Sequence, residues 1–114
     1  MKGLIVKPKW ADLILDGKKT MELRGTNTKI RGKIGIIKSG SKMVYGTVEL
    51  VEVVPILDEE TYIFYNKKHL VDYPFSNIPY KKLYGWILKK PVRYNKPIPY
   101  KHKQGCVIWV NLIE

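Results

Sequence analysis

Cysteine and long apolar runs are scarce in this chain of 114 residues. Cys106 is the one cysteine, which excludes a disulfide framework and favours a reducing compartment, so we expect a cytoplasmic protein. No apolar run approaches the roughly 20 residues that a membrane-spanning helix needs, so we do not expect an integral membrane protein. The apolar segment after Met1 is too short for a signal peptide, and we expect none.

Patterns that hold metals or nucleotide phosphates are also missing. His69 and His102 have no cysteine or carboxylate beside them at ligand spacing, so a structural zinc site is not expected. The glycines are scattered and form neither a phosphate-binding loop nor a dinucleotide fingerprint. We therefore predict a protein without a metal, without a cofactor and without nucleotide-hydrolysis machinery.

Acidic residues are few compared with basic ones. Lysine and arginine number 21 against 10 aspartates and glutamates, which gives a net charge of +11. Such an excess favours a polyanionic partner such as nucleic acid, although many small basic proteins bind nucleic acid only loosely. Both halves of the chain are basic, and there is no repeat or linker. We therefore expect one globular domain over residues 1–114, monomeric by default.

Hydrophobic periodicity predicts an α+β fold. Pro8 and the spacing of Trp10, Leu13 and Ile14 predict a helix over residues 8–16. The order of acidic and then basic residues over 58–69 complements a helix dipole and predicts a second helix. Strands are expected over residues 2–7, 20–24, 33–37, 43–54, 84–88, 92–96 and 106–112. Five to seven mainly antiparallel strands with two short helices should form a sheet that curls into a small barrel.

Charged and hydroxyl side chains gather on one short segment. Alternation along the strand over 20–24 turns one set of side chains toward the core and the other set to the opposite face. The second set, with the turn before it, comprises Lys18, Lys19, Thr20, Glu22 and Arg24. These groups either converge in a binding pocket or form an exposed ion pair on an open sheet face, which contributes little to stability. Spacing alone favours the exposed pair, because a pocket needs a wall opposite the strand.

A stretch without acidic residues runs from Tyr80 to Gln104. Its lysines and arginine offset phosphate charge, and its interleaved aromatic rings can stack on unpaired bases, each stack contributing about 1–3 kcal/mol. The alternative is that several rings belong to the core and about half of the lysines are ordinary surface. We expect Trp86 to be at least partly buried.

Several motifs follow one another in order along the chain. They are Pro8-x-Trp10-Ala11-x-Leu13-Ile14-x-x-Gly17-x-Lys19-Thr20-x-Glu22-x-Arg24, then Ile30-Arg31-Gly32-Lys33-Ile34, Tyr45-Gly46-Thr47-Val48, Tyr84-Gly85-Trp86-Ile87-Leu88, Pro97-x-Pro99-Tyr100 and Gln104-Gly105. Together they resemble the ASCH domain, named for homology to a transcriptional activating-signal cointegrator. The resemblance spans nearly the whole chain.

The resemblance implies a β-barrel of the PUA-like superfamily, whose relatives bind RNA, with a cleft between the barrel and its first helix. Such a cleft favours the pocket over the exposed ion pair. In it, Arg24 and Lys19 would hold a phosphate or a base edge, and Glu22 would accept hydrogen bonds from an exocyclic amine or a hydroxyl. The residues expected to bind the ligand are Trp10, Lys18, Lys19, Glu22, Arg24, Ser39, Tyr100, Lys101 and Gln104.

Two functions of different class remain. We predict a nucleic-acid-binding module, with RNA as the main partner. The alternative is a small metal-independent hydrolase, because the resemblance also includes ASCH-like proteins that are amidohydrolases of acylated cytidine or ribonucleases. Catalysis would then fall to Lys19, Thr20 and Glu22. The chain departs from the amidohydrolase pattern K-T-x-T-x-R, because Glu22 occupies the place of the hydroxyl residue.

Overall fold

The fold is built on one curved sheet, seen in the computed structural model, which describes residues 1–112. In chain order the elements are β1 (Lys2–Val6), α1 (Pro8–Leu15), β2 (Met21–Arg24), β3 (Gly32–Lys38), β4 (Met43–Ile56), α2 (Glu59–Phe64), α3 (Asn66–His69), the 3₁₀ turn η1 (Phe75–Asn77), β5 (Leu83–Pro99) and β6 (Trp109–Asn111). The strand order is β2-β5-β4-β3-β1-β6, and β1–β3 is the parallel pairing among antiparallel ones. A mixed, mainly antiparallel α+β sheet is thereby confirmed.

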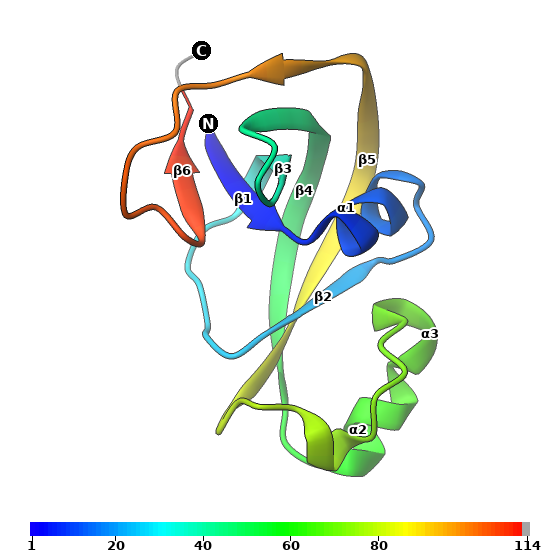
Figure 1. The fold of residues 1–114 in the computed structure, drawn as a ribbon. Helices are drawn as coiled ribbons and strands as arrows, with labels where there is room; N and C mark the ends of the chain where they lie inside the picture. The colour runs from blue at the N-terminus through cyan, green and yellow to red at the C-terminus, as the bar shows by residue number, and fades with distance from the viewer. Residues whose placement is uncertain (113–114) are drawn as a thin grey trace.

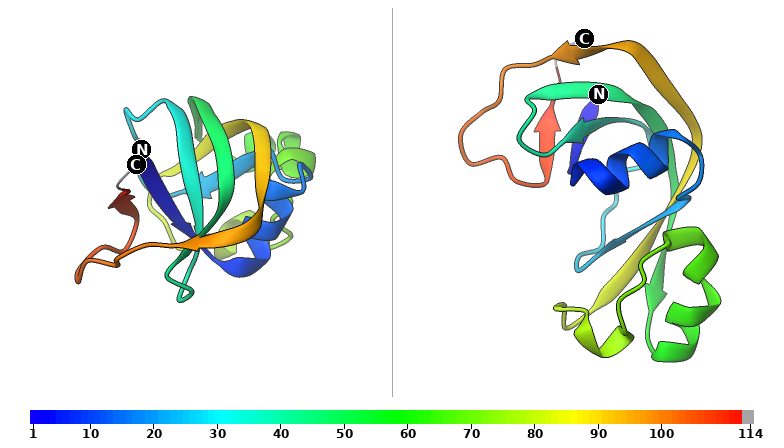
Figure 2. Two further views of the ribbon diagram at one scale, coloured as in Figure 1. Left: turned by 90° about the horizontal axis from the view of Figure 1, so that it is seen from above. Right: turned by 45° about the vertical axis from the view of Figure 1, so that its right-hand side comes forward.

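The sheet is strongly curved (Figure 2), and β4 and β5 run side by side along most of the molecule (Figure 1). Helices α2 and α3 lie at one end of these two strands, and α1 lies beside their middle (Figure 1). The pairings run from β2 at one edge to β6 at the other. Within residues 1–112 no pairing joins these two edges, so closure into a barrel is not shown.

The prediction of separate strands over 84–88 and 92–96 is wrong, because β5 is continuous from Leu83 to Pro99. Pro91 suggests that the strand ends there, but β5 continues through a β-bulge that includes this proline. Lys89 and Val92 of β5 pair with Glu49 and Thr47 of β4, so the longer stretch on β5 bulges between these pairs. Lys90 adopts a left-handed conformation at φ 52° inside the bulge.

The last strand is shorter than predicted. Residues 106–112 were expected to be extended, whereas β6 covers only Trp109–Asn111. The chain before it turns back on itself, because the N–H of Cys106 donates to the carbonyl of Lys103 at 3.2 Å and Gly105 has φ 92°. This turn uses residues that would otherwise extend the strand.

The single helix predicted over 58–69 is also wrong, because the chain bends at Tyr65 and forms two short helices. In a continuous helix Tyr62 and His69 would lie about 10 Å apart along the axis. Instead their ring centroids are 4.7 Å apart, and His69 Nε2 lies 2.9 Å from the Tyr62 carbonyl. Within residues 1–112 no helix is both long and apolar enough to cross a membrane.

Two apolar clusters meet near α1. The larger one packs α1 onto the middle of the sheet around Trp86, whose ring is fully buried and stacks on Trp109 with centroids 5.7 Å apart. The smaller one joins Met21 of β2 to the α2–α3 region through Tyr62. Trp10 packs against both clusters, so the surface between them forms beside α1. The expected burial of Trp86 is confirmed.

Candidate functional site

A cleft of about 330 Å³ opens beside α1, between β2 and the loop over residues 70–82. This volume is at the lower end of the roughly 300–1,000 Å³ typical of small-molecule sites. Its polar and aromatic lining comprises Lys7, Trp10, Glu22, Arg24, Ser39, Tyr73 and Tyr80. The loop provides the wall opposite β2 that the spacing of the sequence could not supply.

Strand β2 sorts its side chains as alternation predicts. Met21 is fully buried against Gly85 of β5, where a Cβ on the glycine would come within 2.5 Å of the Met21 sulfur. Glu22 and Arg24 lie on the other face, opposite Trp86 and Tyr84 in the register with β5. The strand therefore anchors itself through one face and presents the charged pair on the other.

Glu22 lies in a buried network of charges. Arg24 donates to Glu22 Oε2 from Nε at 3.0 Å and from Nη2 at 2.8 Å, and Nη2 also donates to the Ile5 carbonyl at 2.9 Å. On the other side, Lys19 Nζ lies 3.6 Å from Glu22 Oε1. The side chains of Glu22 and Arg24 are 7% and 17% exposed. This is therefore an enclosed network and not an ion pair on an open sheet face.

Lys19 is the innermost member of this network. Its side chain has no exposed surface, and Nζ donates a short hydrogen bond to the His69 carbonyl and lies 4.6 Å from the Trp10 ring centroid. Burial lowers the pKa of Lys19, opposed by the charge of Glu22 and reinforced by that of Arg24. Lys19 does not line the cleft, so it positions Glu22 and Trp10 from behind.

His69 is a structural residue that the sequence analysis did not identify. Its ring is fully buried. Nδ1 accepts a hydrogen bond from the Val71 N–H at 2.9 Å, which assigns the proton to Nε2, the atom that lies 2.9 Å from the Tyr62 carbonyl. Because its carbonyl holds Lys19, this residue connects the loop wall to the charged network.

Acid should weaken this connection. Burial lowers the pKa of His69, and the nearby charge of Lys19 lowers it further. Below the ordinary histidine pKa of about 6.5, the unfolded chain binds the proton more readily, so stability falls as pH falls. We expect the free energy of unfolding to drop by up to about 1.4 kcal/mol per pH unit in that range.

Urea unfolding at a series of pH values between neutral and mildly acidic measures this dependence. His69→Gln should flatten it, whereas His102→Gln, at the other histidine, should leave it in place. A His69→Gln variant with the same pH dependence as the unmodified protein would show that other groups cause the acid sensitivity.

Two polar groups of the network remain available to a ligand. Within residues 1–112, the Nη1 group of Arg24 has no hydrogen-bond partner, and Glu22 Oε1 has only the long contact to Lys19. An arginine nitrogen donates and a carboxylate oxygen accepts. The cleft can therefore donate to a carbonyl or phosphate oxygen and accept from an amine or hydroxyl, beside the half-buried Trp10 ring.

The cleft brings together only some of the residues predicted for the site. It includes Trp10, Glu22, Arg24 and Ser39. The other predicted residues lie elsewhere: Lys19 is behind the network, Thr20 lines a separate hollow of about 170 Å³, Lys18 and Gln104 are exposed outside the cleft, and Tyr100 and Lys101 line other hollows. The cleft is therefore lined by fewer of the predicted binding residues than expected.

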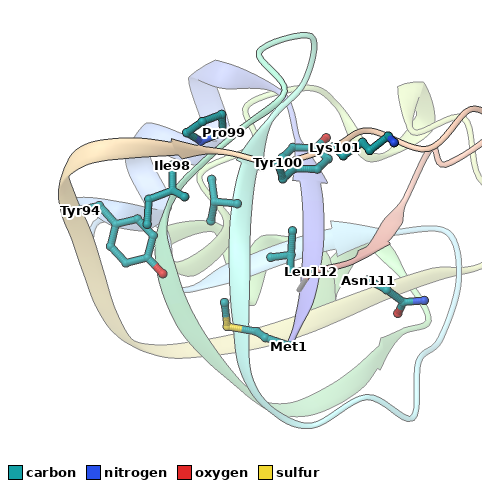
Figure 3. Close-up of a pocket in the computed structure, with 9 residues that line it drawn as sticks. Met1, Tyr94, Ile98, Pro99, Tyr100, Lys101, Asn111 and Leu112 are labelled. Atoms are coloured by element: carbon teal, nitrogen blue, oxygen red, sulfur yellow. The ribbon is translucent and has the colours of Figure 1, made fainter. Parts of the chain in front are cut away.

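A different hollow, of about 410 Å³, lies under the far end of β5. Figure 3 shows it surrounded by Met1, Tyr94, Ile98 and Leu112, which are mostly apolar. Among residues 1–112, its lining includes no carboxylate and no arginine. Because a ligand there would meet few groups that fix its orientation, size alone does not make this hollow the site.

The acid-free stretch from Tyr80 to Gln104 does not form one stacking surface. Tyr80 lines the cleft, Trp86 is in the core, and Tyr94 lines the hollow under the far end of β5. Arg93 is occupied by ion pairs to carboxylates at α1. The alternative view of this stretch, as part core and part ordinary surface, describes most of it.

The sequence analysis missed the loop wall. Tyr73 and Tyr80 both line the cleft, and each is next to a proline in the sequence. Exposed aromatic residues in a loop fixed by prolines are a usable signal for a binding wall, because such loops carry binding residues at little cost in ordering. What the sequence could not show is that this loop faces β2.

Comparison with known proteins identifies the fold family. The model of the ASCH domain matches residues 4–99. The crystal structure of ASCH from Zymomonas mobilis superimposes with a TM-score of 0.72 at 21% identity, covering 86% of this chain and 72% of that one. A serine-to-alanine variant of that protein gives 0.76 at 19% identity, covering 99% and 88%. At these identities the likeness shows the fold alone, and no curated protein matches the chain.

Proposed function

The chain belongs to the ASCH domain family, and on this premise we propose that it binds nucleic acid, mainly RNA, through the cleft beside α1. The observation that carries the proposal is the buried charged network, which presents Glu22 and Arg24 side by side in a cleft with aromatic walls. Unpaired bases combine hydrogen-bonding edges with flat faces, and this lining offers partners for both.

The role of each residue in the cleft lining follows from the hydrogen-bonding atom or the ring that it offers to a ligand. Arg24 Nη1 donates to a base carbonyl or a phosphate oxygen, and Glu22 Oε1 accepts from an exocyclic amine or a hydroxyl. Trp10 offers its ring as a stacking surface at the side of the cleft. Lys19 stays behind Glu22 and holds the carboxylate in place.

The overall charge supports the same proposal. A net charge of +11 attracts a polyanion from a distance and speeds its encounter with the cleft. The PUA-like relatives implied by the sequence motifs bind RNA, which favours RNA over other polyanions. We expect affinity to fall as salt rises, since phosphate contacts release counterions.

The hydrolase alternative finds less support in the geometry. A lysine base would have to reach the substrate, yet Lys19 Nζ is buried between Glu22 and the His69 carbonyl. Thr20 and Lys19 line a small hollow separate from the cleft, and Glu22 lines the cleft instead. Incubation with acetylcytidine and with oligo-RNA in the presence of a chelator should give no product. Turnover that disappears in Lys19→Ala would favour the enzyme instead.

Arg24→Gln tests the proposal most directly. It removes the guanidinium that faces the cleft, and a lost arginine contact to a nucleic acid costs about 1–3 kcal/mol, or roughly tenfold in affinity. We expect the dissociation constant for a single-stranded oligoribonucleotide to rise about tenfold by fluorescence anisotropy.

Lys67→Ala is the matched control. It removes one positive charge from the exposed face of α3, outside the cleft lining. We expect less than a twofold effect, because it changes only the diffuse field. Equal losses in the two variants would mean that the cleft is not the binding site and that charge alone attracts the RNA.

Gly25→Ala tests whether the loop wall takes part. A Cβ at Gly25 would come within 2.6 Å of the Tyr80 ring, so the ring must shift from its present place in the cleft wall. We expect RNA affinity to fall several-fold with little change in thermal stability, since Tyr80 is 49% exposed. Thr26→Ala, at the exposed neighbouring position, should bind normally. Normal binding by Gly25→Ala would remove Tyr80 from the proposed interface.

A further inference from the structure

A second hollow adjoins the cleft. It has a volume of about 340 Å³ and lies between the turn that carries Lys42 and the segment that carries Tyr100 and His102. Three residues line both spaces: Ile5, Ser39 and Val107. The two hollows are therefore neighbours along one surface, with Ser39 at their junction.

The walls of this second hollow are held in place by the backbone. The N–H of Tyr100 donates to the carbonyl of Lys42 at 3.2 Å, which ties the two walls together. Ser41 Oγ donates to the Lys38 carbonyl at 2.7 Å and accepts from the Met43 N–H at 3.1 Å. Lys42 itself is held in the left-handed region at φ 57°, a conformation that surrounding contacts must maintain in a non-glycine residue.

The side chains of the second hollow differ in kind from those of the cleft. Tyr100 and His102 are linked by a hydrogen bond of 2.9 Å between the hydroxyl and Nδ1, with their rings at 66° to each other. Lys42 adds an exposed ammonium, and the part of the chain that the structure describes places no carboxylate in this lining. Such a surface can stack on a base and neutralise a phosphate without reading a particular base edge.

From this juxtaposition we propose that the cleft and the second hollow together bind consecutive nucleotides of a single strand, the second nucleotide resting on Tyr100 beside Lys42. The inference rests on the proposed function. It names the ligand as single-stranded nucleic acid of at least two nucleotides, in preference to a free base or a mononucleotide. The similar volumes of the two hollows, about 330 and 340 Å³, suit one nucleotide each.

The Tyr100→Leu variant, measured with an oligonucleotide and with a mononucleotide, tests whether the second hollow binds a nucleotide. It removes the stacking ring and keeps an apolar side chain at the position. We expect affinity for a short single-stranded oligoribonucleotide to fall about tenfold, and affinity for a ribonucleoside monophosphate to change less than twofold. Lys42→Gln, on the exposed side of the turn, should weaken only oligonucleotide binding. The slope of log affinity against log salt concentration should fall by the amount expected for the loss of about one phosphate contact.

Tyr94→Leu is the control, because it makes the same change at a half-buried tyrosine that lines the hollow under the far end of β5 and neither the cleft nor the second hollow. It should bind both ligands normally. Lys42→Gln serves as the second test if Tyr100→Leu fails to fold.

The outcomes separate this inference from the function on which it rests. If Arg24→Gln weakens oligonucleotide binding while Tyr100→Leu and Lys42→Gln do not, the cleft binds RNA and the second subsite is wrong. Equal weakening of mononucleotide and oligonucleotide by Tyr100→Leu would also overturn the subsite, since the effect would then be structural. If Arg24→Gln changes neither ligand's affinity, the proposed function itself fails.

Discussion

Glu22→Gln is expected to lower the free energy of unfolding by about 3–5 kcal/mol, the range seen when one partner of a buried ion pair is removed. Of the carboxylates in residues 1–112, Glu22 is the one that pairs with both Lys19 and Arg24, and its side chain is 7% exposed. Without its charge, the fully buried ammonium of Lys19 keeps a hydrogen bond to the His69 carbonyl but loses its counterion. An uncompensated buried charge is among the most costly defects a fold can carry.

Urea unfolding of a matched pair measures this effect. Glu49→Gln removes a carboxylate whose contact to Lys90 is 3.7 Å long and exposed to solvent, so it should change stability by less than about 1 kcal/mol. The double variant Lys19→Met, Glu22→Gln removes the buried cation as well and should recover much of the loss. A single Glu22→Gln variant as stable as Glu49→Gln would contradict the interpretation of the network as buried and mutually dependent.

The same variant should change the response to alkaline pH. Burial lowers the pKa of Lys19 in the folded protein, whereas the unfolded chain keeps the ordinary value of about 10.4. Between these two values the unfolded state binds more protons, so stability rises with pH. Glu22 holds the Lys19 pKa up, and its removal extends this window toward neutral pH. The penalty of Glu22→Gln should therefore shrink between pH 7 and pH 10.

Local patterns predicted the parts of the fold that depend on local interactions. The helix expected over 8–16 is α1, because Pro8 and the apolar spacing fix both its start and its buried face. Alternation correctly separated Met21 from Glu22 and Arg24. The predictions failed where long-range contacts decide. The bulge at Lys90 needs β4 as a partner, and the bend at Tyr65 forms because His69 turns back onto Tyr62.

The site shows the same division. Residues that share β2 could be grouped from the sequence, because a strand fixes their relative direction. Whether such a group is covered depends on elements far away in the chain, and Tyr80 reaches the cleft only because its loop folds over Gly25. Lys19 lies behind the cleft lining for a related reason. Its neighbour in space is the His69 carbonyl, 50 positions away, which holds it inside.

Gly46→Ala should be the most damaging of the glycine substitutions in the sheet. A Cβ at Gly46 would lie 2.2 Å from the Val92 carbonyl oxygen and 3.0 Å from the Arg93 Cα, both of which are backbone atoms of β5. It would also come within 2.8 Å of Leu15 at the end of α1. Gly46 therefore lies where α1, β4 and β5 come close together, and no side-chain rotation can relieve a contact with backbone.

The expected result for Gly46→Ala is a loss of about 3 kcal/mol or more, measured by urea unfolding. Gly85→Ala is the matched control, because its Cβ would meet only the Met21 side chain, with the sulfur at 2.5 Å, and a methionine can change rotamer. A loss of about 1–2 kcal/mol is expected there. Since Met21 anchors β2, Gly85→Ala should also disturb Glu22 and weaken RNA binding, whereas folded Gly46→Ala protein should bind normally. Equal stability losses at the two glycines would mean that the β5 backbone moves aside at no greater cost in free energy than the Met21 side chain. The close contact between β4 and β5 at Gly46 would then not be a rigid constraint on the sheet.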